Sequence, residues 1–177
     1  MKNSLLLLLF AFSTSFLTAQ VHDNTIQREA MKKLEFLEGN WSGTANMMIR
    51  GQGNQVINQT EKVWFMLDST ILVIEGLGKS ADEEAKTVHH AFAVISYDET
   101  AEKYNFRSWL ENGLSGDYTA YFDDAGDFIW IMENMNGGTV RYKIRLDEND
   151  QWTETGEWSG DGAQWFGFLS MVLKKEG

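Results

Sequence analysis

Apolar and polar residues recur with two different periods along this chain. Between residues 25 and 38, apolar side chains are spaced by four, four and three positions, which places them on one face of a helix. These side chains are Ile26, Ala30, Leu34 and Leu37. From residue 40 onward the helical period gives way to alternation with period 2. We therefore expect a short amphipathic helix followed by strands, with Gly39 ending the helix.

Ten strand-like segments follow at a regular pitch, separated by turns rich in Asp, Asn and Gly. The clearest runs from Thr139 to Leu146, where apolar and polar residues alternate strictly, as in an antiparallel strand with one face in water. The expected strands cover residues 40–50, 55–67, 70–78, 87–97, 102–110, 114–122, 127–135, 138–146, 151–158 and 163–174.

Consecutive antiparallel strands joined by short turns predict an up-and-down meander. An open sheet of ten strands would expose two edges, and closing it into a barrel removes them. A barrel of this size leaves room for a small apolar ligand. The predicted fold is therefore an all-β, ten-stranded antiparallel barrel with a short N-terminal capping helix and with Trp41 sealing one end.

Residues 1–19 have the features of a secretory signal. Lys2 gives a positive start, Leu5 to Phe12 form an apolar core, and Ala19 is a small residue before the expected cut at Gln20. The apolar run is too short, and too interrupted by Ser13, Thr14 and Ser15, to be a membrane anchor. We expect an exported chain, periplasmic or secreted, with one domain over residues 20–177 and no membrane span after signal removal.

Net charge and composition limit the kinds of partner and chemistry that we expect for this protein. The formal net charge is −11, and an acidic surface repels phosphate backbones, so we expect no nucleic-acid partner. The chain has no Cys, so its stability must come from the core and the strand ladders. No nucleophile elbow and no phosphate-binding glycine motif occurs, so the sequence points to no catalytic residue. The oligomeric state is left open.

The segment Leu34-x-x-Leu37-x-Gly39-x-Trp41-x-Gly43 resembles the opening motif of the calycin-like barrels related to nitrobindin. It is closer still to secreted bacterial proteins of the DUF1579 kind. The strand from Ile71 to Gly78, and Ser96-Tyr97-Asp98 followed by Tyr104 across a hairpin, fit the same pattern. The resemblance implies a ten-stranded barrel that the N-terminal helix closes at one end, and it implies less about activity.

The resemblance to nitrobindin also raises haem, which such proteins bind through a His near the C-terminus. This chain departs from that pattern, because no His follows His90. Met171 could ligate iron in principle, but a Met on a terminal strand is core far more often. We therefore expect no haem and no other cofactor.

His89 and His90 are adjacent on an expected strand, so their side chains point to opposite faces and cannot clamp one metal ion. His90 shares its phase with Val88, Phe92 and Val94, which makes it the candidate for the lumen. The competing interpretation is a core or rim His that is hydrogen-bonded locally. With His22 distant near the N-terminus, we expect no metal site.

Glu75 and Glu133 lie in phase with apolar neighbours on their strands, where a carboxylate is costly unless it is paired. Arg107 and Arg141 are possible partners. One interpretation is that these carboxylates face the lumen and orient a ligand. The other is that they are rim charges at strand ends.

The seven Trp residues are bulky enough to line a cavity or simply to fill a core. We take Trp41, Trp64 and Trp109 as further lumen candidates. Together with Glu75, His90, Arg107 and Glu133, they make up the expected ligand-binding set.

Three hypotheses about function remain. The leading one is an exported barrel that binds a small hydrophobic or amphipathic ligand in its lumen. The second is an enzyme in which Glu75, His90, Arg107 or Glu133 converge inside the barrel. The third is an interaction protein whose loops or outer surface carry the function, which a large exposed apolar patch would favour.

Overall fold

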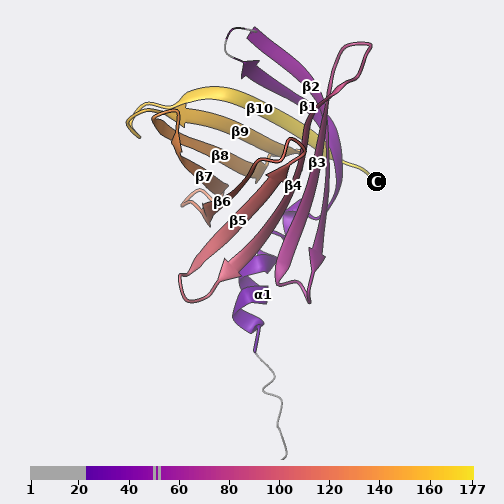
Figure 1. The fold of residues 1–177 in the computed structure, drawn as a ribbon. Helices are drawn as coiled ribbons and strands as arrows, with labels where there is room; N and C mark the ends of the chain where they lie inside the picture. The colour runs from indigo at the N-terminus through magenta and orange to yellow at the C-terminus, as the bar shows by residue number, and fades with distance from the viewer. Residues whose placement is uncertain (1–22, 50, 52) are drawn as a thin grey trace, which may run out of the picture.

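A computed structural model describes residues 23–49, 51 and 53–177, and within them the chain forms a closed barrel with a short helix at one end (Figure 1). The helix is α1 (Thr25–Lys32), followed by a 3₁₀ turn, η1 (Glu35–Leu37). The strands are β1 (Gly39–Ile49), β2 (Gly53–Met66), β3 (Ile71–Ser80), β4 (Thr87–Asp98), β5 (Lys103–Leu110), β6 (Ser115–Phe122), β7 (Phe128–Met135), β8 (Gly138–Leu146), β9 (Trp152–Ser159) and β10 (Phe166–Lys175). The expected signal at residues 1–19 and the cut before Gln20 lie outside the described residues.

Each strand pairs antiparallel with the strands before and after it, and β1 also pairs with β10. The closing ladder runs from Trp41 opposite Lys175 to Met47 opposite Leu169. The sheet therefore has no free edge along this seam, and the prediction of a ten-stranded up-and-down barrel is confirmed.

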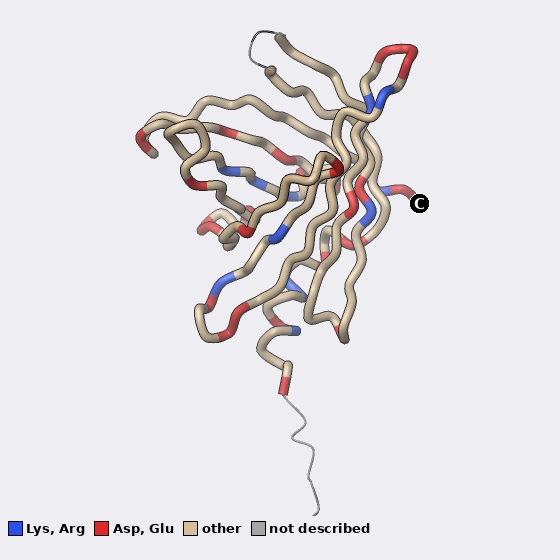
Figure 2. The backbone as a smooth tube through the Cα atoms, in the orientation of Figure 1, with Lys and Arg blue, Asp and Glu red and all other residues tan. Residues whose placement is uncertain are grey.

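The hairpin turns are held by aspartates. Asp98, Asp123, Asp147 and Asp161 each accept hydrogen bonds from two backbone N–H groups of their own turn through one carboxylate oxygen. This geometry is the reason that Asp favours such turns. Figure 2 shows acidic residues gathered in the loops between strands, so much of the negative charge lies away from the barrel wall.

The N-terminal helix is shorter than the sequence predicts. α1 ends at Lys32, and the N–H groups of Leu34 and Leu37 bond to carbonyls three residues earlier, which tightens the chain into η1. This turn brings Met31, Leu34 and Leu37 fully out of solvent. Ile26, which the helical spacing places on the buried face, is instead half exposed, because α1 projects from the end of the barrel.

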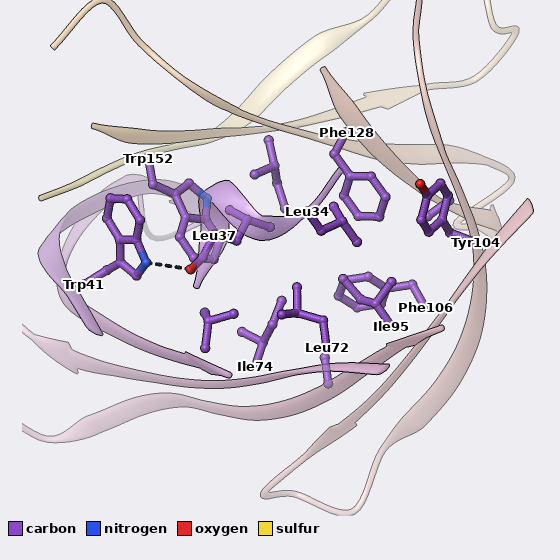
Figure 3. Close-up of a cluster of buried hydrophobic side chains, with 14 of the residues drawn as sticks. Leu34, Leu37, Trp41, Leu72, Ile74, Ile95, Tyr104, Phe106, Phe128 and Trp152 are labelled. Atoms are coloured by element: carbon purple, nitrogen blue, oxygen red, sulfur yellow. Dashed lines mark hydrogen bonds between the residues drawn. The ribbon is translucent and has the colours of Figure 1, made fainter. Parts of the chain in front are cut away.

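The core lies where these residues enter the barrel (Figure 3). Trp41 is 1% exposed, donates its indole N–H to the carbonyl of Leu37 at 2.8 Å, and packs edge-on against Trp152. The hydroxyl of Tyr104 donates to the carbonyl of Ala30 at 2.7 Å. The helix, η1 and Trp41 together close this end of the barrel, as the opening motif implies.

Candidate functional site in the barrel lumen

A cavity of about 170 Å³ lies inside the barrel beyond this core. Small inward-facing residues leave the space open, namely Ala45, Gly76, Ala91 and Ala93. Ile57, Ile74, Ile144 and Met171 give much of the remaining wall an apolar character. We call this space the lumen cavity.

One side of the lumen cavity carries buried polar groups from β2. Gln59 and Glu61 point inward and are 5% and 9% exposed. The side-chain amide of Gln59 donates to the Glu61 carboxylate at 2.7 Å. The sequence makes room for both, because the facing residues on β3 are glycines. A Cβ on Gly76 would lie 2.7 Å from the Glu61 carboxylate, and one on Gly78 would lie 2.6 Å from the Gln59 amide oxygen.

A second carboxyl, that of Glu154 on β9, also faces the lumen cavity. Burial is the main cause that raises the pKa of Glu154 to about 8, and the nearby Glu61 raises it further. Burial also raises the pKa of Glu61 to about 7, against the opposing effect of the Gln59 hydrogen bond. Among the described residues, no Lys or Arg lines the cavity to balance these two carboxyls.

Two indole N–H groups accompany Glu154. The N–H groups of Trp130 and Trp152 lie near enough to the Glu154 carboxyl to lower its pKa. Neither reaches hydrogen-bond geometry with an acceptor in the described part of the chain, although both nitrogens are buried. A buried donor whose hydrogen bond is not completed costs roughly 1–3 kcal/mol, so each of these needs an explanation such as strain, a catalytic role, or a bound water or ion.

An aromatic wall forms another side of the lumen cavity. Phe106 and Trp130 are stacked with ring centres 4.6 Å apart, and Trp130 and Tyr142 are stacked at 4.1 Å. Gly156, opposite Tyr142 in the ladder, gives the Tyr142 ring its space. Burial raises the pKa of the Tyr142 hydroxyl above its usual range, so this hydroxyl stays neutral.

The structure reverses the expected orientation of the two histidines. His89 lines the lumen cavity, and burial together with the neighbouring His90 lowers its pKa. His90 lies on the outer face, with its ring nitrogens 3.6 Å from Glu75 and 3.5 Å from Glu111. The prediction that His90 and Glu75 face the lumen is therefore wrong. The pattern misled because the apolar residues in phase with His90 face outward, whereas the inward-facing positions of β4 carry the small residues Ala91 and Ala93.

Three further candidates form part of an outer row of side chains. Trp64 contacts Phe92, and Phe92 contacts Trp109, with ring centres 6.5 and 6.1 Å apart. Arg107 lies over the Trp109 ring and pairs with Asp117. None of these residues lines the lumen cavity, so their predicted inward orientation is wrong.

The two remaining candidates also lie away from the cavity wall. Glu133 is exposed near the end of β7, where an irregularity between Met132 and Met135 interrupts the ladder to β8. It is therefore a strand-end charge and not a lumen group. Trp41 is not among the residues that line the cavity, but it packs against Trp152, which is.

Sequence reasoning missed the polar groups that the lumen does contain. These are Gln59, Glu61, His89, Tyr142 and Glu154, with the indoles of Trp130 and Trp152. A signal was present for Glu61, which shares its phase with Ile57 and Val63, and for Glu154, which shares its phase with Trp152. A second signal was the pair of glycines on β3 that faces Gln59 and Glu61.

No protein-family model and no curated protein sequence matches this chain. Solved structures do match it. The crystal structure of Rv2717c from M. tuberculosis has a TM-score of 0.64 and 11% identity, covering 84% of this chain and 98% of that one. The S-type phycobiliprotein lyase CPES from Guillardia theta has a TM-score of 0.58 and 11% identity, covering 86% of this chain and 96% of that one.

Both neighbours are ten-stranded barrels, which agrees with the calycin-like fold that the opening motif implies. At 11% identity this likeness shows the fold alone. In the described part of the chain, no helix has the length and hydropathy needed to span a bilayer, and no group of three His, Asp or Glu residues is placed to hold a metal ion.

Proposed function

We propose that this chain is an exported binding protein that holds a small amphipathic ligand in the lumen cavity. The observation that carries the proposal is the combination of an apolar and aromatic wall with two buried carboxyls and two indole donors that complete no hydrogen bond. Such a mixture of apolar lining and a few convergent polar groups is typical of ligand sites. The resemblance to the DUF1579 kind and the signal-like residues 1–19 support export.

The volume limits the size of the ligand. Sites for drug-sized molecules measure about 300–1,000 Å³, whereas an apolar cavity of about 150 Å³ holds benzene. At about 170 Å³, the lumen cavity suits a molecule of six to nine non-hydrogen atoms. The same volume supports leaving haem out of the proposal, although His89 and Met171 both line the cavity. Titration with haem should give no shift of its Soret band.

The binding proposal is tested by filling the cavity. Ala93 is 5% exposed and lines the lumen cavity, whereas the next residue, Val94, lies in the outward phase of β4. We expect benzyl alcohol and n-hexanol to shift the indole N–H signals of the wild-type protein saturably in ¹H–¹⁵N spectra. Ala93→Leu should abolish these shifts, and Val94→Leu, which places the same side chain on the outer face, should leave them.

The proposal is contradicted if benzyl alcohol, n-hexanol and benzylamine all fail to produce a saturable shift in the folded wild-type protein. It is also contradicted if Ala93→Leu binds the two alcohols as the wild type does. The site of signal cleavage is tested separately, by the N-terminal residue of the exported protein, which we expect to be Gln20.

An enzyme with its active site in the lumen is the second candidate, and one observation favours it. Glu61 and Glu154 have pKa values raised to about 7 and 8, which suit a general acid and a general base near neutral pH. A neighbour with this fold is named a lyase. The residues first expected to converge, Glu75, His90, Arg107 and Glu133, do not meet in the lumen and take no part in this candidate.

A further inference from the structure

The described residues that line the lumen cavity include two acids but no Lys or Arg. Its titratable residues are Glu61 on β2, His89 on β4, Tyr142 on β8 and Glu154 on β9. Tyr142 is neutral because its pKa is raised, and His89 is neutral at pH 7 and above because its pKa is lowered. The two carboxyls therefore have no cation to face among the described residues of the cavity wall.

Three features of the site remain unsatisfied together. Glu61 disfavours the ionisation of Glu154, and burial disfavours the charged form of each. The indole N–H groups of Trp130 and Trp152 lie near the Glu154 carboxyl without completing a hydrogen bond to it. An ionised Glu154 would be a stronger acceptor for these donors than a protonated one. A single positive charge placed at the two carboxyls would resolve all three features.

The possible ligands can be compared on this basis. An organic carboxylate would bring a negative charge beside two buried acids whose own ionisation is already disfavoured, which is strongly unfavourable. A neutral alcohol would bring no positive charge to stabilise the ionised form of either carboxyl. A cation would let both ionise, and its apolar part would lie against Phe106 and Trp130, whose stacked rings also line the cavity.

We infer that the lumen ligand is a small amphipathic organic cation, whose protonated nitrogen lies at Glu61 and Glu154 and whose apolar part packs on the aromatic wall. This inference rests on the proposed function and names its ligand class. The net charge of −11 adds a long-range attraction for cations at low salt.

Benzylamine, benzyl alcohol and benzoate share one ring and differ in charge, so they separate the alternatives. We expect benzylamine to bind the wild type at pH 8 at least about tenfold more tightly than benzyl alcohol, and benzoate not to bind. The readout is the indole N–H signals of Trp130 and Trp152 in ¹H–¹⁵N spectra, assigned with Trp130→Phe and Trp152→Phe. Equal or tighter binding of benzyl alcohol or benzoate would overturn the inference while leaving the binding function intact.

Variants test the two carboxyls directly. Glu154→Gln and Glu61→Gln should each weaken benzylamine by about tenfold and change benzyl alcohol by no more than about twofold. Glu75→Gln makes the same change on the outer face of β3, next to Gly76, and should alter neither. The inference fails if the lumen variants, shown by thermal melting to be folded, retain wild-type affinity for benzylamine.

The pH dependence gives an independent readout. Benzylamine is protonated throughout pH 5–8, whereas Glu61 and Glu154 lose protons towards the upper end of this range. Affinity for benzylamine should therefore rise with pH, and affinity for benzyl alcohol should not. His89 and Tyr142 remain neutral over the upper half of the range and do not supply this change. A flat or falling benzylamine profile would contradict the inference.

Discussion

Glu154 is the residue at which burial and ionisation conflict most strongly. A buried carboxyl near a second acid, with no Lys or Arg among the described residues of the cavity wall, costs free energy whenever it ionises. On β9 the nearest residues in the same phase as Glu154 are Trp152 and Gly156. Two buried acids in such surroundings lower the stability of the fold, and ligand binding would explain why the chain has them.

The free energy of unfolding should therefore depend on pH in a defined direction. In the unfolded chain these carboxyls ionise near pH 4.5, but in the folded protein they ionise at about 7 and 8. Between these values the folded state holds more protons, so its stability is full below pH 4.5 and falls as pH rises towards 8. At about 1.4 kcal/mol for each pKa unit, the loss is on the order of 3–5 kcal/mol per carboxyl.

Glu154→Gln should remove a large part of this slope. We expect the variant to match the wild type in urea unfolding at pH 4 and to exceed it at pH 8. Glu157→Gln is the matched control on the same strand, since Glu157 pairs with Arg141 at 2.7 Å outside the lumen cavity. The control should lose about 1 kcal/mol at pH 8, as expected for one ion pair. A wild-type stability that rises from pH 5 to pH 8 would contradict the raised pKa values.

At the scale of the element, the strands were predictable because two signals coincided. Alternation of apolar and polar residues marks each strand, and Asp-rich turns mark where it ends. β8, predicted from the pattern at Thr139 to Leu146, is found at Gly138–Leu146. The helix was predicted less well, because its 3₁₀ ending depends on how η1 packs into the barrel and leaves no periodic trace.

Which face of each strand points inward was the part that the pattern could not decide. On β4 both faces carry apolar residues, since Phe92 belongs to the outer aromatic row, and Ala93 and Ile95 point inward. Larger apolar residues usually mark the buried face, but a lumen that keeps a cavity needs small ones. Because the larger residues were assigned to the inside, His90 and Glu75 were predicted to face the lumen, where the structure has His89 and Gly76.

Gly43 shows how closely one element constrains its neighbour. A Cβ at this position would lie within 2.1 Å of the Val172 carbonyl oxygen on β10, and backbone cannot move aside as a side chain can. We expect Gly43→Ala to lower the free energy of unfolding by roughly 1–3 kcal/mol or more, because the β1–β10 ladder must shift. Urea unfolding measures the loss.

Gly167→Ala is the control for this prediction. Gly167 lies on β10, has no atom near its missing Cβ and has no positive φ. Its replacement should change stability by less than about 1 kcal/mol, in the stabilising direction if at all. If both glycine variants behaved alike, the close approach at the seam would not be the cause.

At the scale of the whole molecule, one end of the barrel is closed by a segment that precedes the first strand. Trp41 joins the two parts, because it belongs to β1, bonds to Leu37 and packs on Trp152 of β9, two strands along the sheet. Trp152 in turn lines the lumen cavity. The capping segment and the cavity are thus connected through two indoles.

Replacing Trp41 should affect the whole molecule. We expect Trp41→Ala to cost about 3–5 kcal/mol, the range for a large buried aromatic, and Trp41→Phe to cost less, with the lost hydrogen bond contributing about 1 kcal/mol. Trp109→Ala deletes the same ring from the outer row, where it is 38% exposed, and should cost clearly less. Thermal and urea unfolding rank the three variants, and an equal cost for Trp41→Ala and Trp109→Ala would contradict the role of Trp41.

The pairing of β1 with β10 has a consequence for how the protein is made. A chain that emerges amino-terminus first presents Gly39–Ile49 early, and β2 covers one side of it soon afterwards. The other side has no native partner until Phe166–Lys175 arrives at the opposite end of the sequence. Ring closure over so long a stretch is slow. Until β10 has formed, the unpaired edge of β1 can pair with a strand of another newly made chain, which leads to aggregation.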